Sequence, residues 1–542
     1  MRCSFGWLLM LRGLVAVYAA QELPSAGDSR TAADSSRRLL AIDPSSIEYT
    51  SPNTEITLGP VTKDPHNPFF GESQPWDIAW WNTYPTVAYD AKDAKFKMWY
   101  NGVGNCSCAK GHRACTVANR STMSPGDGMC PHLGYNYTTT TFGGSSLGKT
   151  YYAESGDGIH WERPALGVVD FLGSKSNNIV LETNTDPNRG VFLDEHESNA
   201  SRRFKMFGDI GTAGTHTQKH AGVATLVSAD GIHWNGIQSA VSMRVAADTA
   251  NNAVFDKDLK KYIAFSRNHC THSSCNVSGW GVRRETQSTS STWGGGWSVA
   301  TEALHGEHGY EMYSLVPFRA ANWTAGLYLG IGSFYETTNP EGYVRCELCR
   351  STDFGKTWQR LAPHRNFIPP GPQNSFDSHT CYAAPAISDP TDPHTMLIYY
   401  AGGDGPHSGG GKEHGRANFM ARATAATEGM AGITSTPGTG SGIIRSRPLQ
   451  ISGEERNLRI RTMSGSSIGV SMIDAESNVQ ILAGIADAPH TNDMSTATTQ
   501  EVSVVWKLAD AESMRSALPK QGTVILRFLL HSKSTLFSFG FD

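Results

Sequence analysis

Short runs in which apolar and polar residues alternate cover most of the chain, and turns rich in Gly, Pro and Asp separate them. Alternation with a period of two, together with many aromatic and β-branched residues, predicts strands rather than helices. The strands recur in units of four: an apolar strand, an aromatic-rich strand, a strand that enters an Asp-containing turn, and a strand that follows a Trp. The five apolar first strands are expected at residues 85–90, 190–194, 252–256, 313–317 and 383–387.

Three of the turns have nearly the same sequence, at Ser155–Trp161, Ser228–Trp234 and Ser351–Trp358, and the last fits S-x-D-x-G-x-T-W. The Asp side chain can accept hydrogen bonds from backbone N–H groups of the turn, and Gly supplies a positive φ. We therefore expect structural roles for the turn residues Asp157, Asp230 and Asp353, and for the strand-end residues Asp194 and Asp256. Such a turn, repeated at long intervals, is typical of a radial β array, and successive four-strand units after the first lie about 60 to 70 residues apart, as in propeller blades.

The sequence therefore predicts an all-β protein, a five-bladed β-propeller followed by a C-terminal β-sandwich. The propeller is expected over residues 72–430, with a Cys-rich insertion at about 103–149. The strand pattern changes after it, and residues 438–542 are expected to form the sandwich. Residues 21–71 are polar and are expected to form an N-terminal arm or an edge strand.

Residues 1–20 have the features of a secretory signal peptide. Arg2 precedes an apolar run that is interrupted by Arg12 and ends at Ala19 and Ala20. A signal anchor is the alternative. Six glycosylation sequons agree with a secreted, extracellular glycoprotein, and they lie at Asn105, Asn119, Asn136, Asn199, Asn276 and Asn322.

Cysteine usage also fits an oxidising compartment. The chain has 10 cysteines, of which Cys3 lies in the signal peptide, so nine remain. Four of them are expected to staple the insertion, and Cys270 can reach Cys275. Cys346 and Cys349 form a CxxC pair, but no second such pair supports a zinc site. The odd total leaves one thiol unpaired, and Cys381, in a buried strand, is the expected one.

The formal net charge of −4 gives no electrostatic case for nucleic-acid binding. No internal stretch is apolar and long enough to span a bilayer. Neither a metal site nor a cofactor is expected, except that Ca²⁺ could assist one of the alternatives given below. The oligomeric state stays open.

Several segments resemble the five-bladed propeller superfamily of glycoside hydrolase families 32, 43 and 68. The closest resemblance is to poorly characterised secreted members that are family-32-like and carry a C-terminal β-sandwich. The segments are residues 95–102, 154–164, 177–181, 376–383 and 398–403. The resemblance implies a carbohydrate substrate and an axial funnel, built where the innermost strands begin, in which three carboxylates act.

Carboxylates ahead of the five inner strands are therefore the catalytic candidates. Glu311 is the expected acid/base, because Tyr310–Pro317 is similar to the family-32 segment in which a Glu precedes an apolar inner strand. Burial in a funnel raises the pKa of such a group, as an acid catalyst needs. Asp248 and Asp377 are the expected partners. The expected substrate-binding residues are Asp77, Trp81, Asn82, Arg189, Arg267, His379 and Tyr382.

The chain departs from family 32 in the first blade. That family places its nucleophile in an Asn-Asp-Pro-Asn-Gly segment, whereas Trp81–Thr86 keeps Asn82 and Pro85 but has no Asp. Asp77 could substitute from the preceding loop. Three functions stay open: a glycosidase, a non-catalytic glycan-binding protein, and a polysaccharide lyase that uses His379 or Tyr382, with Ca²⁺ offsetting substrate charge.

Overall fold

The computed structural model describes most of the chain. The described residues are 33–34, 38–74, 76–77, 80, 82–104, 147–171, 173–183, 189–209, 223–235, 247–268, 284–339, 342–407, 416–451, 457–489, 498–506 and 522–541. Within these ranges the protein is all-β, with one short 3₁₀ turn at Ala200–Arg202 and no helix that could span a membrane. The signal peptide and residues 105–146 of the insertion lie outside the described residues.

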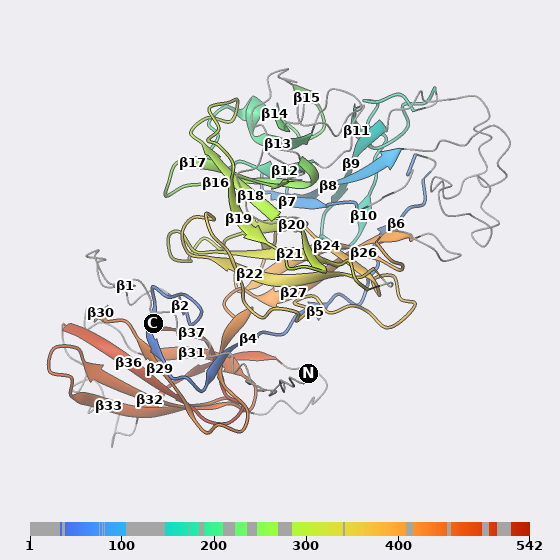
Figure 1. Cartoon of the computed structure of the whole chain (residues 1–542). Helices are drawn as coiled ribbons and strands as arrows, with labels where there is room; N and C mark the ends of the chain where they lie inside the picture. Colours follow the sequence, from blue (N-terminus) through green and yellow to red (C-terminus); the bar gives the residue numbers. More distant parts are fainter. Residues whose placement is uncertain are drawn as a thin grey trace, which may run out of the picture.

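Three separate antiparallel sheets form the first part of the molecule (Figure 1). The first contains β7 (Thr86–Asp90), β8 (Lys95–Gly104), β9 (Leu147–Ser155), β10 (Trp161–Glu162) and β11 (Ile179–Thr183). The second contains β12 (Gly190–Leu193), β13 (Phe204–Asp209), β14 (Val223–Ser228) and β15 (Trp234–Asn235). The third contains β16 (Ala247–Asp256), β17 (Lys261–Asn268), β18 (Arg284–Ser290) and β19 (Thr301–His305).

A ten-stranded sheet follows, and it consists of two units joined by one parallel pair, Val344 with Thr380. The first unit is β20 (Tyr310–Phe318), β21 (Tyr328–Glu336), β22 (Val344–Ser351) and β23 (Gln359–Arg360). The second unit is β24 (Thr380–Ala383), β25 (Ile387–Ser388), β26 (Thr395–Gly403) and β27 (Asn418–Ala426). Two N-terminal strands pair with β27 and extend this unit, namely β5 (Thr62–Lys63) and β6 (Phe70–Gly71).

Asp-containing turns connect neighbouring units. Asp230 Oδ1 accepts the backbone N–H groups of Ile232 and His233, each at 2.8 Å. Gly231, with a φ of 82°, lies against Trp99 of the preceding unit, whose indole N–H donates to the Gly231 carbonyl at 2.7 Å. The structural roles of Asp157, Asp230 and Asp353 are confirmed, because all three accept turn N–H groups.

The same contact joins the last unit to the first. Gly158 of the first unit lies against Tyr399 of β26, whose hydroxyl donates to the Gly158 carbonyl at 3.0 Å. Gly355 of the fourth unit lies against Phe265 of the third, and Trp293 of the third donates to the Leu226 carbonyl of the second. The units therefore contact one another in chain order, and the end of the series meets its beginning.

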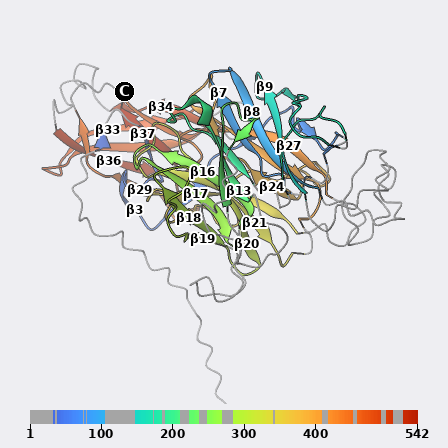
Figure 2. The same ribbon diagram turned by 90° about the horizontal axis from the view of Figure 1, so that it is seen from above.

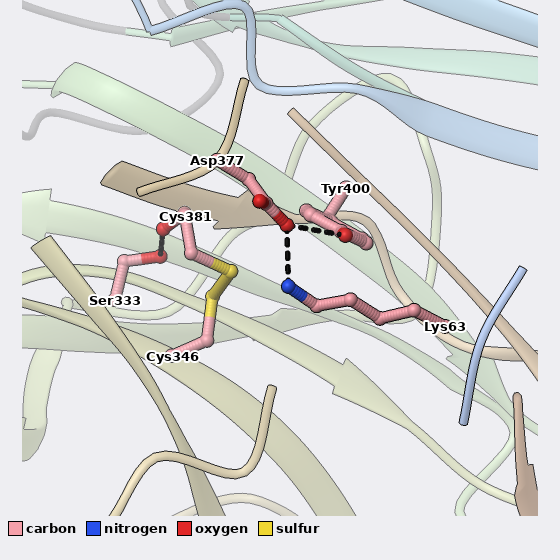
Figure 3. The surroundings of a disulfide bond; sticks show 6 residues. All are labelled: Lys63, Ser333, Cys346, Asp377, Cys381 and Tyr400. Carbon is pink, nitrogen blue, oxygen red and sulfur yellow. Dashed lines mark hydrogen bonds and ion pairs between the residues drawn. A yellow bond between two sulfur atoms is a disulfide. The ribbon is translucent and has the colours of Figure 1, made fainter. Parts of the chain in front are cut away.

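A disulfide between Cys346 and Cys381 links the fourth unit to the fifth (Figure 3). The prediction that Cys381 is unpaired is therefore wrong, and within the described part of the chain the free thiol is Cys349, which is buried. Cys346 and Cys349 are three positions apart on β22, so they point to opposite faces of the sheet. They pack in different apolar clusters, which rules out a local pair between them.

Two further sheets form the C-terminal part, and their strands β29, β33, β36 and β37 lie together to one side of the earlier sheets (Figures 1 and 2). The eight-stranded sheet contains β1 (Ala33–Asp34), β3 (Ile47–Thr50), β29 (Gly442–Ser446), β30 (Leu449–Ile451), β32 (Ser467–Asp474), β33 (Gln480–Asp487), β35 (Val505–Trp506) and β36 (Gly522–Leu530). The six-stranded sheet contains β2 (Leu39–Leu40), β4 (Thr54–Leu58), β28 (Ala431–Ser435), β31 (Leu458–Met463), β34 (Thr499–Ser503) and β37 (Thr535–Phe541).

These two sheets share one apolar core. Phe528 of the first and Phe539 of the second are both fully buried, with ring centroids 5.0 Å apart. The core also contains the N-terminal residues Leu39 and Ile47. The segment before the first unit thus contributes strands to both C-terminal sheets and to the fifth unit.

Replacing Cys346 and Cys381 together by Ala is expected to lower the free energy of unfolding by about 2–4 kcal/mol, because the bond closes a long loop. The two cysteines are 35 residues apart. Urea unfolding measures the effect. Cys349→Ala is the control and is expected to cost about 1 kcal/mol, since it removes only one buried sulfur. Equal stability of the double variant and the wild type would contradict the structural role of the disulfide.

Candidate active site

The inner strands of the five units pack closely around one narrow gap. Each of these strands, or the residues just before it, contributes to the wall: Tyr84 and Pro85 before β7, Arg189 and Gly190 at β12, Ala250–Asn252 in β16, Val316 in β20, and Ala383 in β24. Residues of these five strands are therefore brought to one region, although they are far apart in the sequence.

A histidine held between two tyrosines lies in this region. The ring nitrogens of His407 are each 2.7 Å from a hydroxyl, Nε2 from that of Tyr313 and Nδ1 from that of Tyr382. The ring of Tyr335 packs on His407 with centroids 4.6 Å apart. A neutral imidazole has one donor and one acceptor nitrogen. When the His407 ring is neutral, it therefore donates to one tyrosine hydroxyl and accepts from the other. We call Tyr313, Tyr335, Tyr382 and His407 the tyrosine–histidine cluster.

Two buried arginines flank the tyrosine–histidine cluster. Arg416 donates to the Asn82 side-chain oxygen at 3.0 Å and to the His407 carbonyl at 3.2 Å. The guanidinium carbon of Arg267 lies 4.5 Å from the centre of the Tyr313 ring. Both arginines are at most 5% exposed. The predicted residues Asn82, Arg267 and Tyr382 are thus brought together around His407, which the sequence analysis did not single out.

Glu285 lies directly across from Arg267 in the β17–β18 pair and is fully buried. Burial raises the pKa of Glu285 well above its ordinary range, and the positive charge of Arg267 opposes this rise. A carboxyl group in such surroundings favours its protonated form.

Glu72 is a further carboxyl that the sequence analysis missed. It follows β6 and accepts the backbone N–H of Trp80 at 3.0 Å. Burial raises the pKa of Glu72 to about 8; the negative charge of Asp77 adds to the rise, whereas Asn418 and Arg416 oppose it. Glu72 keeps partial exposure to solvent. Glu72 does not lie just ahead of an inner strand, and it reaches the site because β6 pairs with β27.

Asp77 lies in a buried ion pair beside Glu72. Its Oδ2 atom accepts Arg163 Nη1 and the backbone N–H of Gln74, both at 2.8 Å. Burial raises the pKa of Asp77, and the guanidinium of Arg163 lowers it. With 3% of its surface exposed, Asp77 holds the segment before β7 in place.

Glu311 is the second residue of β20 and pairs with Tyr335 of β21. Residues directly opposite in an antiparallel pair project from the same face of the sheet. Glu311 therefore emerges on the side of Tyr335, whose ring packs on His407, and it is partly exposed. The expected acid/base thus lies beside the tyrosine–histidine cluster.

Asp377 has a different environment, next to the disulfide (Figure 3). Its Oδ2 atom accepts Lys63 Nζ at 2.5 Å and the Tyr400 hydroxyl at 2.8 Å, and only 4% of the residue is exposed. Lys63 belongs to β5, so this ion pair fastens the N-terminal segment to the fifth unit. No contact among the described residues joins Asp377 to Glu311, and its geometry fits a structural role.

The other expected residues are placed as follows. His379 stacks on Tyr343 at 5.1 Å, and its Nδ1 is 2.8 Å from the Ser378 hydroxyl. Arg189 is buried and donates to the hydroxyls of Thr150 and Thr183, which ties the first unit to the second. The backbone of Asp248 belongs to β16, while its side chain and the whole of Trp81 lie outside the described residues. Across the described ranges, no three His, Cys, Asp or Glu residues are grouped to hold a metal.

No family model matches this sequence, and no curated protein matches it. A solved N-acetylgalactosamine deacetylase from F. plautii is 14% identical over 68% of this chain and 96% of its own, with a TM-score of 0.40. A family 43 arabinoxylan arabinofuranohydrolase from Bacillus subtilis is 10% identical over 89% and 98%, with a TM-score of 0.38. An exo-inulinase from Aspergillus awamori is 10% identical over 88% and 98%, with a TM-score of 0.37. The case for a function therefore depends on the residues of this chain.

Stability is expected to depend on the proton of Glu72. Its pKa in the folded protein lies above its ordinary 4.5, so the folded state holds an extra proton from about pH 4.5 to about pH 8. The free energy of unfolding must then fall as the pH rises through this window. Glu72→Gln cannot ionise and is expected to reduce the fall, by on the order of a few kcal/mol.

Urea unfolding at pH 5, 6, 7 and 8 measures this dependence. Glu195→Gln, at an exposed turn, is the matched control and is expected to keep the wild-type slope. An unchanged slope in Glu72→Gln would show that the carboxyl is ionised in the folded protein at neutral pH.

Proposed function

We propose that this protein is a secreted glycoside hydrolase that cleaves an oligo- or polysaccharide in the axial funnel of a five-bladed β-propeller, followed by a β-sandwich. Three observations support a closed ring. Four units have their strands in antiparallel order, the fifth is joined to the fourth through Val344 and Thr380, and Gly158 of the first unit contacts Tyr399 of the fifth. The signal-peptide pattern, the sequons and a disulfide support secretion.

The observation that carries the proposal is the presence of two carboxyl groups, those of Glu72 and Glu311, near the tyrosine–histidine cluster. The positive charge of Arg416, which contacts His407, lowers the pKa of Glu72. Glu311 emerges beside Tyr335, which packs on the same histidine. Glycoside hydrolysis needs one carboxyl that gives a proton to the leaving oxygen and a second that attacks or activates water. The first carboxyl must therefore be protonated and the second ionised.

Glu72 is assigned as the proton donor, because burial raises its pKa to about 8 and keeps it protonated at neutral pH. Glu311 is assigned as the second carboxylate. Asp248, at the beginning of β16, remains the candidate for a third carboxylate that orients the sugar. Arg267, Arg416 and Asn82 supply hydrogen-bond donors for sugar hydroxyls, and the tyrosine rings supply apolar surface for the sugar ring.

The lyase alternative has less support. A lyase base must remove a carbon-bound proton, but burial raises the pKa of Tyr382 far above its ordinary range, and Tyr382 is already bonded to His407. His379 stacks on Tyr343, and its Nδ1 lies 2.8 Å from the Ser378 hydroxyl. A non-catalytic glycan-binding protein is the second candidate. It is favoured by the absence of an Asp in the segment Trp81–Thr86 and by the hydrogen bond that Asn82 accepts from Arg416.

The hydrolase proposal predicts that Glu72→Gln and Glu311→Gln each lower kcat at least 100-fold on a natural glycan found by screening a panel of neutral and acidic polysaccharides. Glu195→Gln is expected to keep wild-type activity. The wild-type kcat/KM is expected to fall above about pH 8, where Glu72 loses its proton.

The two roles can be separated with an aryl glycoside, whose leaving group departs without a proton. Such a substrate is expected to restore turnover by Glu72→Gln but not by Glu311→Gln. Turnover equal to wild type in either variant would remove that residue from the mechanism. Saturable glycan binding without any turnover would select the glycan-binding candidate.

A further inference from the structure

The outward face of the eight-stranded C-terminal sheet carries an unusual row of side chains. Residues alternate between the two faces of a strand, so Ile444 and Phe528 point into the shared core while Arg445 and Arg527 point outward. The strand register puts Tyr49, Arg445 and Arg527 in one row across β3, β29 and β36. An aromatic ring and two guanidinium groups therefore lie side by side on an outer surface.

The two arginines are direct cross-strand partners. Their Cβ atoms are about 5 Å apart in such a pair, and like charges directly opposite destabilise a sheet. Glu48 is the extra residue of a bulge in β3, opposite Arg445 and Ser446. Its Oε2 atom is 3.2 Å from Arg445 Nε. This ion pair is exposed and contributes little. Among the described residues, no carboxylate forms an ion pair with Arg527, so the row keeps a net positive charge.

An open groove follows this row, with a volume of about 420 Å³. Its wall includes Tyr49, Arg445, Ile473, Asn478, Gln480 and Arg527. The groove has the size of a site for a molecule of several rings. Tyr49, which lines the groove, is 49% exposed, and this is high for a large side chain with apolar surface.

We infer that this groove binds an acidic oligosaccharide, a chain of sugars that carries carboxylate or sulfate groups. An arginine presents two parallel N–H groups that match a carboxylate or a sulfate, and two neighbouring arginines can take two such groups along one chain. The exposed ring of Tyr49 offers a flat surface for a sugar ring, and the amides of Asn478 and Gln480 can bond with hydroxyls.

The groove is separate from the axial site. It is formed by the C-terminal sheet and the adjoining β3, whereas the catalytic candidates belong to the earlier sheets and to the segment after β6. Binding in the groove therefore requires no turnover, and loss of one activity leaves the other measurable. An acidic glycan held there would keep the protein attached to a charged polysaccharide matrix.

Binding can be measured on the full-length protein by affinity gel electrophoresis with three probes: polygalacturonate, dextran sulfate and uncharged dextran. The first two probes distinguish carboxylate from sulfate, and at least one of them is expected to bind, more weakly at 500 mM than at 50 mM NaCl. The double variant Arg445→Gln/Arg527→Gln is expected to lose at least tenfold in affinity. Tyr49→Ala is expected to lose about two- to tenfold.

Arg365→Gln is the control, since it removes one positive charge from an exposed turn outside the groove and is expected to keep wild-type affinity. The double variant is expected to melt at the wild-type temperature or above, because a like-charge pair is removed. Unchanged affinity in the double variant, equal binding of uncharged dextran, or an equal loss in Arg365→Gln would overturn the inference. A dimer that the double variant dissociates would also overturn it, because the face would then join two copies of the chain.

Discussion

The contact between the turn of one unit and the aromatic strand of the preceding unit is the interaction on which the rest of the structure depends. A glycine with positive φ lets the turn approach the neighbouring ring, as at Gly231 against Trp99. A Cβ at that position would lie 2.5 Å from the ring of Trp99. The Asp of the turn holds the loop in the shape that this close approach needs, so local hydrogen bonds and packing between units support each other.

Because the units meet in order and the last contacts the first, their inner strands face one small space. Most of the residues that meet there are far apart in the sequence. Arginines from the third and fifth units and tyrosines from the fourth and fifth units come together around His407. Burial of so many polar groups shifts proton equilibria, and the raised pKa values of Glu72 and Glu285 follow from it.

The N-terminal segment has a structural part in both regions of the molecule. Lys63 pairs with Asp377 in the fifth unit, and Glu72 reaches the axial region after β6. Leu39 and Ile47 are buried in the C-terminal core, and Tyr49 reaches the groove on the opposite face of that sheet. The proposed catalytic donor and the proposed glycan groove therefore both depend on residues that precede the first complete unit.

Local patterns in the sequence determined the strands, the Asp-containing turns and the change of pattern after the fifth unit, because alternation and turn chemistry act between residues close in the chain. They also identified Asn82, Arg267, Glu311 and Tyr382 as candidate site residues. Only the tertiary structure decided that Cys381 pairs with Cys346, that Asp377 pairs with Lys63, and that Glu72 is the carboxyl with the raised pKa. Each of these results depends on which strands become neighbours, and burial and charge are properties of that arrangement rather than of any short segment.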